Sequence, residues 1–425
     1  MIATALFVLV LLLALGFPMM VPLLAATLVI IGSLALGPAV VAQQMIGGVQ
    51  PSVLVAVPLF IFAANVMTAG QTADRLVSLA MSLVGHVRGG LPIATATACT
   101  LFGGVSGSTQ ATVVAIGKPM RARLLERGYP DAFAIALIVN ASDIALLIPP
   151  SIGMIVYGVV SGTSVGELFL AGIGPGILVL ALISAYCWRV SPRFGVARIP
   201  KATARERLAA LRAAAFPLGF PVIVVGGIYA GITSPTEAAA ISVAYAVALE
   251  VGVFRTLRWN DLPRLARDSG LITAVVFVLV GAGAAFSWTI SFARVPEQIL
   301  GPLLANLSAS PIELLAVLSA SYFVGCMFVD PIVVILVLTP IFAPAIHASG
   351  IDPVLAGTLV TLQVAIGSAT PPFGCDLFTA VAVFRRPYLE VVRGTPPFLG
   401  LLLVATALII AFPPIALALR DWAMR

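Results

Sequence analysis

The chain has 425 residues, of which 60% are hydrophobic and 9% charged, with a formal net charge of +6. A mean hydropathy of +1.13 excludes a soluble domain. Apolar runs of about twenty residues recur throughout, and each can cross about 30 Å of hydrocarbon. The basic residues are confined to short segments between these runs, which argues against a nucleic-acid surface and indicates membrane topology. We therefore expect an all-α polytopic membrane protein surrounded by lipid, without a nucleic-acid partner.

The first apolar stretch, MIATALFVLVLLLALGF, has neither the basic start nor the small-residue cleavage site of a signal peptide. We expect it to be a retained first helix. The four cysteines all lie in apolar segments without C-x-x-C spacing, which indicates reduced packing residues rather than disulfides or metal ligands. They are Cys99, Cys187, Cys326 and Cys375.

The segment from about 89 to 118 carries basic residues at both ends and LFGGVSGSTQA in its middle. So many Gly and Ser residues do not sustain a helix in lipid, and the like charge at both ends places the ends on one side. These features favour a re-entrant helical hairpin with its tip inside protein over a single kinked helix that spans the membrane. The tip would consist of Ser106, Gly107 and Ser108.

A long segment that begins at Gly128 repeats at Gly350, 222 positions later and without a gap. In both copies an apolar helix is interrupted by two prolines, Pro149-Pro150 in the first and Pro371-Pro372 in the second. Proline removes an N–H donor and clashes with the preceding turn, so each pair frees backbone carbonyls upstream. The pattern predicts an internal duplication in which each copy contains a proline-broken helix.

The loops that flank the two copies have opposite charge character. Lys118, Arg121, Arg123 and Arg127 precede the first copy, whereas the corresponding PIFAPAIHASGIDP contains no Lys or Arg. Since short basic loops stay in the cytoplasm, the copies are predicted to cross the bilayer in opposite directions. We expect an inverted repeat at 1–188 and another at 213–425.

The most polar stretch, 189–212, is predicted to be a basic cytoplasmic linker, with a possible amphipathic surface helix from Arg193 to Arg212. A second re-entrant hairpin is expected at about 311–345, around GCMFVDP. Its ends carry no basic residue, so it should enter from the opposite side. Asp330 lies in its tip, opposite Ser108 of the first hairpin.

There is no Lys or Arg between Gly128 and Trp188, or between Val295 and Phe384. Ser, Thr, Asn, Asp and freed carbonyls must supply the polar atoms there, and these are hard oxygen ligands for a small cation. Helix N-termini can meanwhile face an anion. The competing interpretation is that such hydroxyls bond to their own backbone.

Intramembrane carboxylates are costly and usually functional. Asp330 could bind a cation, accept hydrogen bonds at the tip or relay a proton. For Asp143, whose counterpart is Ala365, loop capping and a functional role remain equally open. We expect Glu237 to cap a helix and Asn65 to be structural.

Several motifs occur in a consistent order along nearly the whole chain: PLFIFAANVM, VGHVRGG, GVSGSTQATVVAIG, LIPPSIGMIVYG, GGIYAGITSPTEAAA and GCMFVDP. Together they resemble the large membrane subunit of tripartite ATP-independent periplasmic (TRAP) transporters. The resemblance implies a bacterial inner-membrane symporter that imports an organic acid by an elevator mechanism, driven by sodium. It also implies two partners, a small four-helix membrane subunit and a periplasmic substrate-binding protein.

In this family, each sodium site involves a hairpin tip and the adjacent broken helix. On this chain the predicted sodium ligands are Ser106, Gly107, Ser108, Asn140, Ser142, Gly325, Asp330, Gly367, Ser368 and Thr370. The predicted substrate-binding residues are Ser106, Thr109, Pro150, Asp330 and Pro372. The sequence departs from the family pattern at Ser142-Asp143-Ile144 and at Pro331.

The main alternative is an elevator-type anion transporter, coupled to sodium or protons, that works without partners. An intramembrane aspartyl protease is disfavoured because neither ASD nor FVDP supplies the G-x-G-D context. A passive channel would not need two broken repeats. The substrate is not specified by the sequence, and dicarboxylates, keto acids, sugar acids and sialic acids all remain possible.

Overall fold

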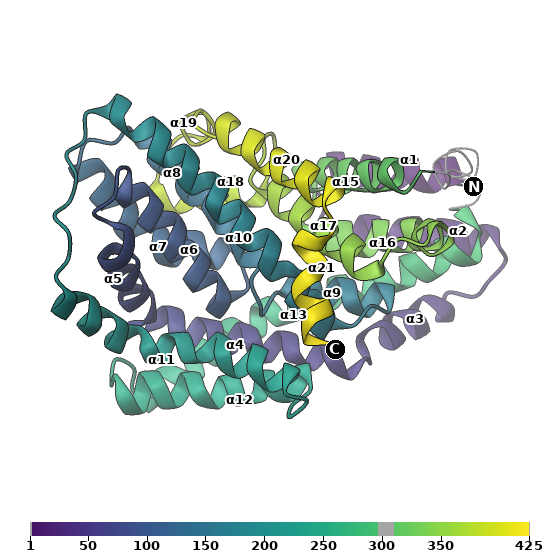
Figure 1. Ribbon diagram of the computed structural model, residues 1–425. Coiled ribbons are helices and arrows are strands. Elements are labelled where there is room, and N and C mark those ends of the chain that lie inside the picture. Colours follow the sequence, from purple (N-terminus) through teal and green to yellow (C-terminus); the bar gives the residue numbers. More distant parts are fainter. Residues whose placement is uncertain (1, 296–309, 425) are drawn as a thin grey trace.

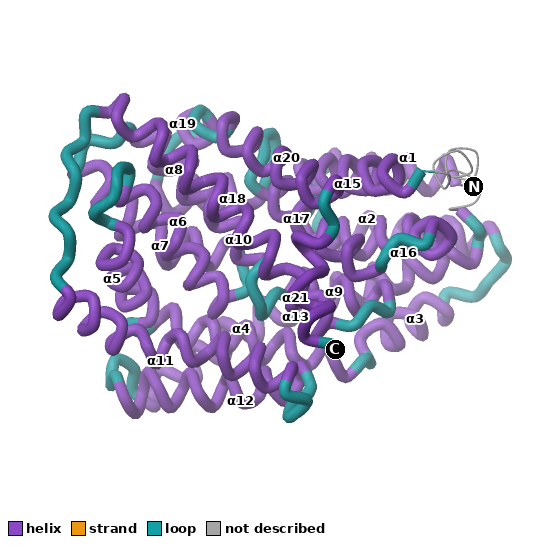
Figure 2. Tube along the Cα trace, in the orientation of Figure 1, coloured by secondary structure: helices purple, strands orange, loops and turns teal. Residues whose placement is uncertain are grey.

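The computed structural model describes residues 2–295 and 310–424, and every regular element in these ranges is helical (Figures 1 and 2). The gap falls inside the second predicted repeat. The α-helices of the first part are α1 (Ile2–Ala14), α2 (Met20–Ser33), α3 (Ala39–Val49), α4 (Ala56–Ala69), α5 (Thr72–Val84), α6 (Gly90–Ser106), α7 (Thr109–Glu126), α8 (Asp131–Ser142), α9 (Ile152–Ser161), α10 (Val165–Val190), α11 (Ala204–Tyr229), α12 (Pro235–Val247) and α13 (Leu262–Phe292). Those of the second part are α15 (Pro311–Phe328), α16 (Pro331–Ser349), α17 (Pro353–Ser368), α18 (Cys375–Phe384), α19 (Tyr388–Val392), α20 (Pro396–Ala411) and α21 (Pro414–Ala423).

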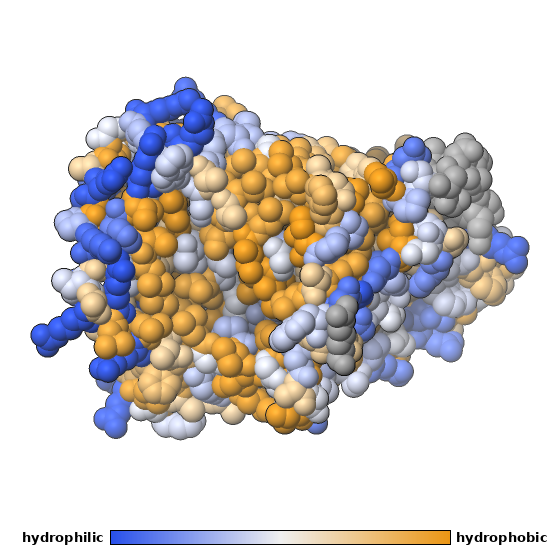
Figure 3. Space-filling view, viewed as in Figure 1, coloured by the Kyte–Doolittle hydropathy of each residue, from blue (hydrophilic) through white to orange (hydrophobic). Residues whose placement is uncertain are grey.

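Among the described residues, seven helices are long and apolar enough to cross a membrane, and there are eight if α20 and α21, bent by 57°, form one span. Large apolar side chains such as Val222 of α11 and Ile177 of α10 are exposed on the outside of these helices. Figure 3 shows a broad hydrophobic surface across the middle of the molecule, with hydrophilic side chains gathered along the left edge and again toward the right-hand side. These features confirm the expected multi-pass membrane protein.

The repeat is visible element by element. Helices α6, α7, α8 and α9 recur as α15, α16, α17 and α18, whose first residues lie 221 to 223 positions later. The two sets also exchange contacts, because α7 packs against α18 while α16 packs against α9. Reciprocal packing of this kind is expected for two copies related by a twofold axis, as in inverted-repeat transporters.

The two broken helices occupy the centre of the protein. From Val354 to Ser368 every residue of α17 is buried, and the same is true of α8 from Phe133 onward. A helix that is apolar on all sides is stable only where neighbours surround it. Helices α4, α11 and α12 form a separate layer, along the lower edge of Figure 1, and α13 connects this layer to α16.

Two predicted segments differ in extent from the structure. The second arm of the first hairpin continues past Lys118 to Glu126, with Pro119 inside the helix, so the basic residues there lie on a helix rather than in a loop. The predicted surface helix from Arg193 is wrong in its first half. Gly195 adopts a left-handed conformation and ends a short 3-10 turn, and α11 starts only at the Thr203–Glu206 capping box.

Three smaller predictions are confirmed. Glu237 forms a capping box with Ser234 at the start of α12. The Asn65 side chain donates a 2.8 Å hydrogen bond to Ser269 Oγ, which joins α4 to α13 and gives Asn65 a structural role. All four cysteines are free thiols, and three of them are buried.

Candidate functional site

Both hairpin tips border one cavity of about 330 Å³. The opposite wall consists of apolar side chains of α4 and α13. The lining residues are Ile61, Gly107, Ser108, Thr109, Gln110, Leu146, Ile152, Gly153, Ile272, Val275, Val276, Leu279, Asp330, Pro331, Ile332 and Cys375. The cavity therefore lies between the two hairpin tips and the α4–α13 layer.

Four helices begin at this cavity. The first turns of α7, α16, α9 and α18 contribute Thr109, Pro331, Ile152 and Cys375 to its lining. The N-terminus of a helix carries partial positive charge and unpaired N–H groups, so it attracts anions. Since none of the lining residues is Lys or Arg, an anion in this cavity would be held by backbone dipoles and hydroxyl groups, whereas Asp330 offers a negative charge to a cationic group.

The first tip rests on the proline break of its own repeat. Gly107 adopts a left-handed conformation with φ of +58°, and a Cβ at this position would overlap the carbonyl oxygen of Pro150. The Ser106 hydroxyl lies 3.1 Å from Thr112 Oγ1, and Ser108 caps α7 through Ala111 N–H. Only a residue without a side chain fits between the tip and the break, which explains the glycine.

The second tip is attached to its own break in a corresponding way. Phe373 N–H donates a 3.0 Å hydrogen bond to the Met327 carbonyl. A Cβ on Gly367 would overlap Cys326, so α15 and α17 approach closely at that point. Asp330 caps α16 by accepting a 2.9 Å hydrogen bond from Ile332 N–H. Both proline pairs contain a cis peptide bond.

Gly325 lies apart from this cavity. It is on α15, its carbonyl accepts Val329 N–H, and it borders a separate apolar groove between α1–α2 and α15–α16. Of the five residues predicted to bind substrate, Thr109 and Asp330 line the cavity, whereas Ser106, Pro150 and Pro372 do not.

Several predicted sodium ligands are engaged with their own helix. Ser142 Oγ donates to the Ile138 carbonyl and Thr370 Oγ1 to the Ile366 carbonyl, at 2.7 and 2.6 Å. Each retains acceptor lone pairs on its hydroxyl oxygen. Asn140 donates through Nδ2 to the Ala136 carbonyl, and its Oδ1 is buried without a hydrogen-bond partner in the described structure.

Asp376 is the residue that sequence reasoning missed. It lies in the first turn of α18 and is fully buried. Its Oδ1 accepts a 2.8 Å hydrogen bond from Thr109 Oγ1, and its Oδ2 a 2.7 Å hydrogen bond from Ser368 Oγ. The carboxylate thus joins the first hairpin to the second broken helix. The sequence did offer a sign of it, because Asp376 is a carboxylate in the segment from Val295 to Phe384, which contains no Lys or Arg.

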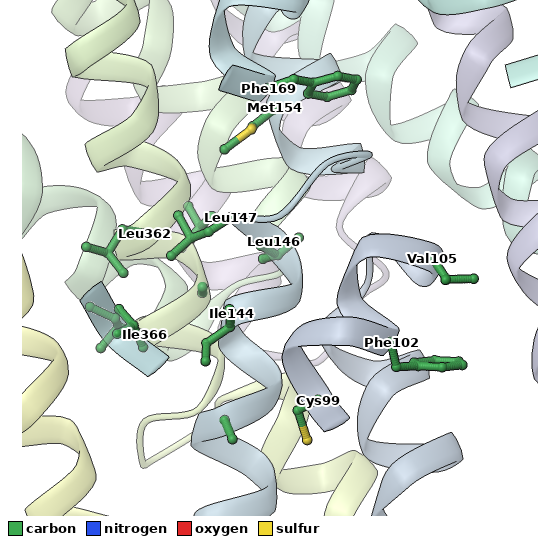
Figure 4. Packing of buried hydrophobic residues seen from close by; sticks show 14 of the residues in the cluster. Cys99, Phe102, Val105, Ile144, Leu146, Leu147, Met154, Phe169, Leu362 and Ile366 are labelled. Atoms are coloured by element: carbon green, nitrogen blue, oxygen red, sulfur yellow. The ribbon is translucent and has the colours of Figure 1, made fainter. Parts of the chain in front are cut away.

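Asp143 forms the first residue of the 3-10 turn η2 (Asp143–Leu146), between α8 and the first proline break. The turn packs between α6 and α17. Figure 4 shows Leu147 and Ile144 facing Leu362 and Ile366 of α17, with Phe102 of α6 on the other side. Neither carboxylate oxygen of Asp143 has a hydrogen-bond partner among the described residues, so the loop-capping interaction, one of the two roles that the sequence left open, is not made.

Ion-pair clusters lie at the starts of the two broken helices. Asp131 at the start of α8 pairs with Arg121 at 2.6 Å and with Arg386 at 3.0 Å. The Arg121 hydrogen bonds lower the pKa of Asp131, with a further contribution from the Arg386 charge. At the start of α17, Asp352 pairs with Arg420 at 2.6 Å.

Comparison with known proteins shows to which family the chain belongs. Residues 6–415 match the family model described as "Tripartite ATP-independent periplasmic transporter, DctM component". The ectoine/5-hydroxyectoine TRAP transporter large permease protein UehC of Ruegeria pomeroyi is 61% identical, over 100% of this chain and 99% of its own. The ectoine TRAP transporter large permease protein TeaC of Halomonas elongata is 58% identical, over 97% of both chains.

Among solved structures, the YdaH transporter of Alcanivorax borkumensis is similar with a TM-score of 0.62 and 16% identity, over 89% of this chain and 88% of its own. At that identity the likeness concerns the fold alone. The family match covers nearly the whole chain, and the two relatives match it from end to end. The chain therefore belongs to the DctM family of TRAP transporter large permeases and is a multi-pass transporter subunit of the inner membrane.

Proposed function

We propose that this chain is the permease through which a tripartite transporter imports ectoine or a closely similar zwitterionic carboxylate, driven by a sodium gradient. Two relatives at 61% and 58% identity are named for ectoine. This proposal narrows the substrate, which the sequence specified only as an organic acid, to this type of solute. The observation that carries it is the cavity at which four helix N-termini converge beside one carboxylate, Asp330.

The chemistry of the cavity fits such a solute. Ectoine carries a carboxylate and a delocalised amidinium on one small ring. Its carboxylate would lie at the helix N-termini, near Thr109 and Ser108, and its amidinium toward Asp330. The apolar ring edge would face Ile272 and Val276 of α13, which line the opposite wall. A dicarboxylate would bring a second negative charge next to Asp330.

Sodium would bind where each tip meets its proline break. Asn140 Oδ1 is buried without a hydrogen-bond partner in the part of the chain that the structure describes, and freed carbonyls add hard oxygens. The predicted ligands in the first repeat are Ser106, Gly107, Ser108, Asn140 and Ser142. In the second they are Gly325, Asp330, Gly367, Ser368 and Thr370, of which Asp330 lines the cavity.

Transport would follow an elevator motion. The cavity has the hairpin tips on one side and α4 with α13 on the other. Movement of the hairpins and broken helices past this layer would carry the bound solute across the membrane. The small four-helix membrane subunit would hold the layer still, and the periplasmic binding protein would deliver the solute.

The test is reconstitution into proteoliposomes with the small subunit and the binding protein. Labelled ectoine should accumulate under an inward sodium gradient, with little uptake by this chain alone. Unlabelled ectoine should compete, and succinate and sialic acid should not. Efficient uptake by the isolated chain would instead favour the partner-free elevator transporter, and uptake that ignores sodium but follows a proton gradient would overturn the coupling ion.

A further inference from the structure

The motif GGIYAGITSPTEAAA spans the end of α11, the turn after it and the start of α12. Gly231 adopts a left-handed conformation with φ of +65°, and Thr233 N–H donates a 3.1 Å hydrogen bond back to the Gly227 carbonyl. The Ser234–Glu237 capping box follows directly and begins α12. Because hydrogen bonds close both helix ends, the last turn of α11 is held in one position together with its Tyr229.

The Tyr229 side chain reaches across to α10. Its hydroxyl donates a hydrogen bond to the Gly166 carbonyl in the first turn of that helix. A Cβ on Gly166 would lie 3.4 Å from Ile228 Cγ2, so α10 and α11 are in contact here. About two turns earlier on α11, Pro221 approaches Gly104 of α6, where a Cβ would lie 3.6 Å from Pro221 Cβ. Two glycines thus let α11 come close to α6 and α10, and the Tyr229 hydroxyl adds a directional bond.

The two partners of this bond belong to different parts of the fold. Helix α10 belongs with the hairpins and broken helices, and these elements together are the hairpin unit. It packs against α6, α9 and α17, and a Cβ on its Gly172 would overlap the Leu147 carbonyl oxygen just before the first proline break. Helix α11 belongs to the layer of α4, α11, α12 and α13, because it packs against α12 and the Tyr245 hydroxyl of α12 donates a 2.6 Å hydrogen bond to its Phe216 carbonyl. Tyr229 therefore bonds across the surface along which the proposed movement takes place.

A single side-chain hydrogen bond joins the hairpin unit to the layer among the residues that the structure describes, once α5 is set aside. It is the bond from Tyr229 to Gly166. Helix α5 leads from the layer into the first hairpin and is fixed to the layer, where Thr72 Oγ1 donates a 2.7 Å hydrogen bond to Glu250. Apolar contacts have no direction and can be exchanged during movement, whereas a hydrogen bond is lost once its atoms separate beyond about 3.5 Å.

We infer that Tyr229 is a latch: its hydrogen bond holds the hairpin unit in the position seen here, and each transport cycle has to break it. The inference rests on the proposed elevator movement and assigns a residue to one of its resting positions. Neither Tyr229 nor Gly166 lines the cavity, so the latch acts on the movement rather than on solute contacts. The net contribution of one hydrogen bond changes a two-state equilibrium by about two- to twelvefold, which biases the position of the unit without trapping it.

Spin-label distances measure this equilibrium directly. Labels are attached to cysteines at Leu389 and Trp259, which are 77% and 70% exposed. Leu389 lies on α19, which packs against α8 and α18 of the unit, and Trp259 lies just before α13 of the layer. Cys375→Ser removes the native thiol that is not buried. Double electron–electron resonance is recorded in proteoliposomes that also contain the small membrane subunit.

The variant is Tyr229→Phe, which keeps the ring and removes the hydroxyl. Tyr245→Phe is the matched control, because the Tyr245 hydroxyl bonds within the layer. We expect wild type and Tyr245→Phe to give the same distance distribution, with the distance of the position seen here dominant. In Tyr229→Phe the ratio of this population to the other should fall about two- to twelvefold. Tyr229→Leu, which also lacks the hydroxyl, replaces it if the phenylalanine variant does not fold.

A reversible disulfide tests whether α10 leaves α11 during transport. The pair Gly166→Cys and Ile228→Cys is close enough to bond, because a Cβ at position 166 lies 3.4 Å from Ile228 Cγ2. The control pair, Gly227→Cys and Thr233→Cys, stays within the turn after α11, where the two Cβ atoms would be 3.8 Å apart. With both partners present, oxidation should stop ectoine uptake by the first pair only, and reduction should restore it.

An unchanged distance distribution in Tyr229→Phe, or an equal shift in Tyr245→Phe, would overturn the latch. If oxidation of the 166–228 pair nevertheless stops uptake, the movement stands and only the role of Tyr229 fails. Full uptake by the cross-linked 166–228 pair would overturn the latch and the elevator movement together, while sodium-driven ectoine import would stand on the uptake itself.

Discussion

The hydroxyl of Thr109 donates a 2.8 Å hydrogen bond to Asp376 Oδ1, across 267 positions of the chain. Thr109 starts the second arm of the first hairpin, and Asp376 lies in the first turn of the helix that follows the second proline break. Both residues adjoin the cavity, because Thr109 and Cys375 are among its lining residues. The position of the first tip is therefore coupled to the second repeat.

Removing this hydrogen bond should impair transport more than folding. Thr109→Val has the same shape and leaves Asp376 with one partner, which costs about 1–3 kcal/mol for a buried polar group. We expect a lower maximal uptake rate and a reduced unfolding midpoint. Thr379→Val is the control, because the Thr379 hydroxyl donates a hydrogen bond to the Cys375 carbonyl of its own helix. Equal uptake by the two variants would argue against a coupling role.

Gly107→Ala should abolish uptake. Its new Cβ would overlap the Pro150 carbonyl, and the left-handed backbone adds about 1–2 kcal/mol for any residue with a side chain. Gly162→Ala separates the two effects, since Gly162 is also left-handed, with φ of +73°, but a Cβ there meets nothing within 4 Å. Only Gly107→Ala should lose transport, as measured in proteoliposomes with both partners present.

The predicted sodium ligands can be tested by removing single hydroxyls. Ser106→Ala and Thr370→Ala should each raise the sodium concentration needed for half-maximal uptake more than they reduce the amount of folded protein. The Ser106 oxygen lies within the first tip, and Thr370 lies just before the second proline pair. If both variants keep the wild-type sodium dependence, these hydroxyls are not ligands.

Topology can be measured with an impermeant maleimide on single-cysteine variants. Arg121 and Arg386 both pair with Asp131, so the end of α7 and the loop after α18 share one side of the protein. Cysteines at Arg123 and Arg386 should therefore react from the cytoplasm, and one at Ser349 only from the periplasm. Labelling of positions 123 and 349 from the same side would contradict the inverted repeat.

The Asp131 cluster should make stability acid-sensitive. Its pKa is lowered in the folded state by hydrogen bonds from Arg121. The ion pairs thus stabilise the folded state fully above the pKa that Asp131 has in the unfolded chain, near 3.8. This stabilisation is lost as the pH falls from there through the lower pKa of the folded state. Asp131 is partly exposed, so the effect should be modest. In melts from pH 6 down to about pH 3, the deficit of Asp131→Asn relative to wild type should shrink.

The repeat, the broken helices and the hairpin tips could be predicted because their signals are local. Proline and glycine interrupt a helix wherever it packs, and basic loops mark one side of the membrane regardless of tertiary contacts. The 222-residue offset between Gly128 and Gly350 aligned the two copies without any structure. The extents of α7 and α11 were less predictable, because Pro119 is accommodated within a helix and a capping box at Thr203 decides where the other begins.

The site itself depended on the tertiary structure. Thr109 and Asp376 are far apart in the chain, and only the reciprocal packing of α7 on α18 brings them together. The same packing directs four helix N-termini into one cavity, which no periodicity in a single segment encodes. It also encloses Asp143 between α6 and α17, where its carboxylate has no hydrogen-bond partner among the described residues. Composition and local sequence determined that this chain spans a membrane and contains two copies of one helical pattern. The burial of the Asp143 and Asp376 carboxylates, and the meeting of four helix N-termini at one cavity, arose only when the two copies packed against each other.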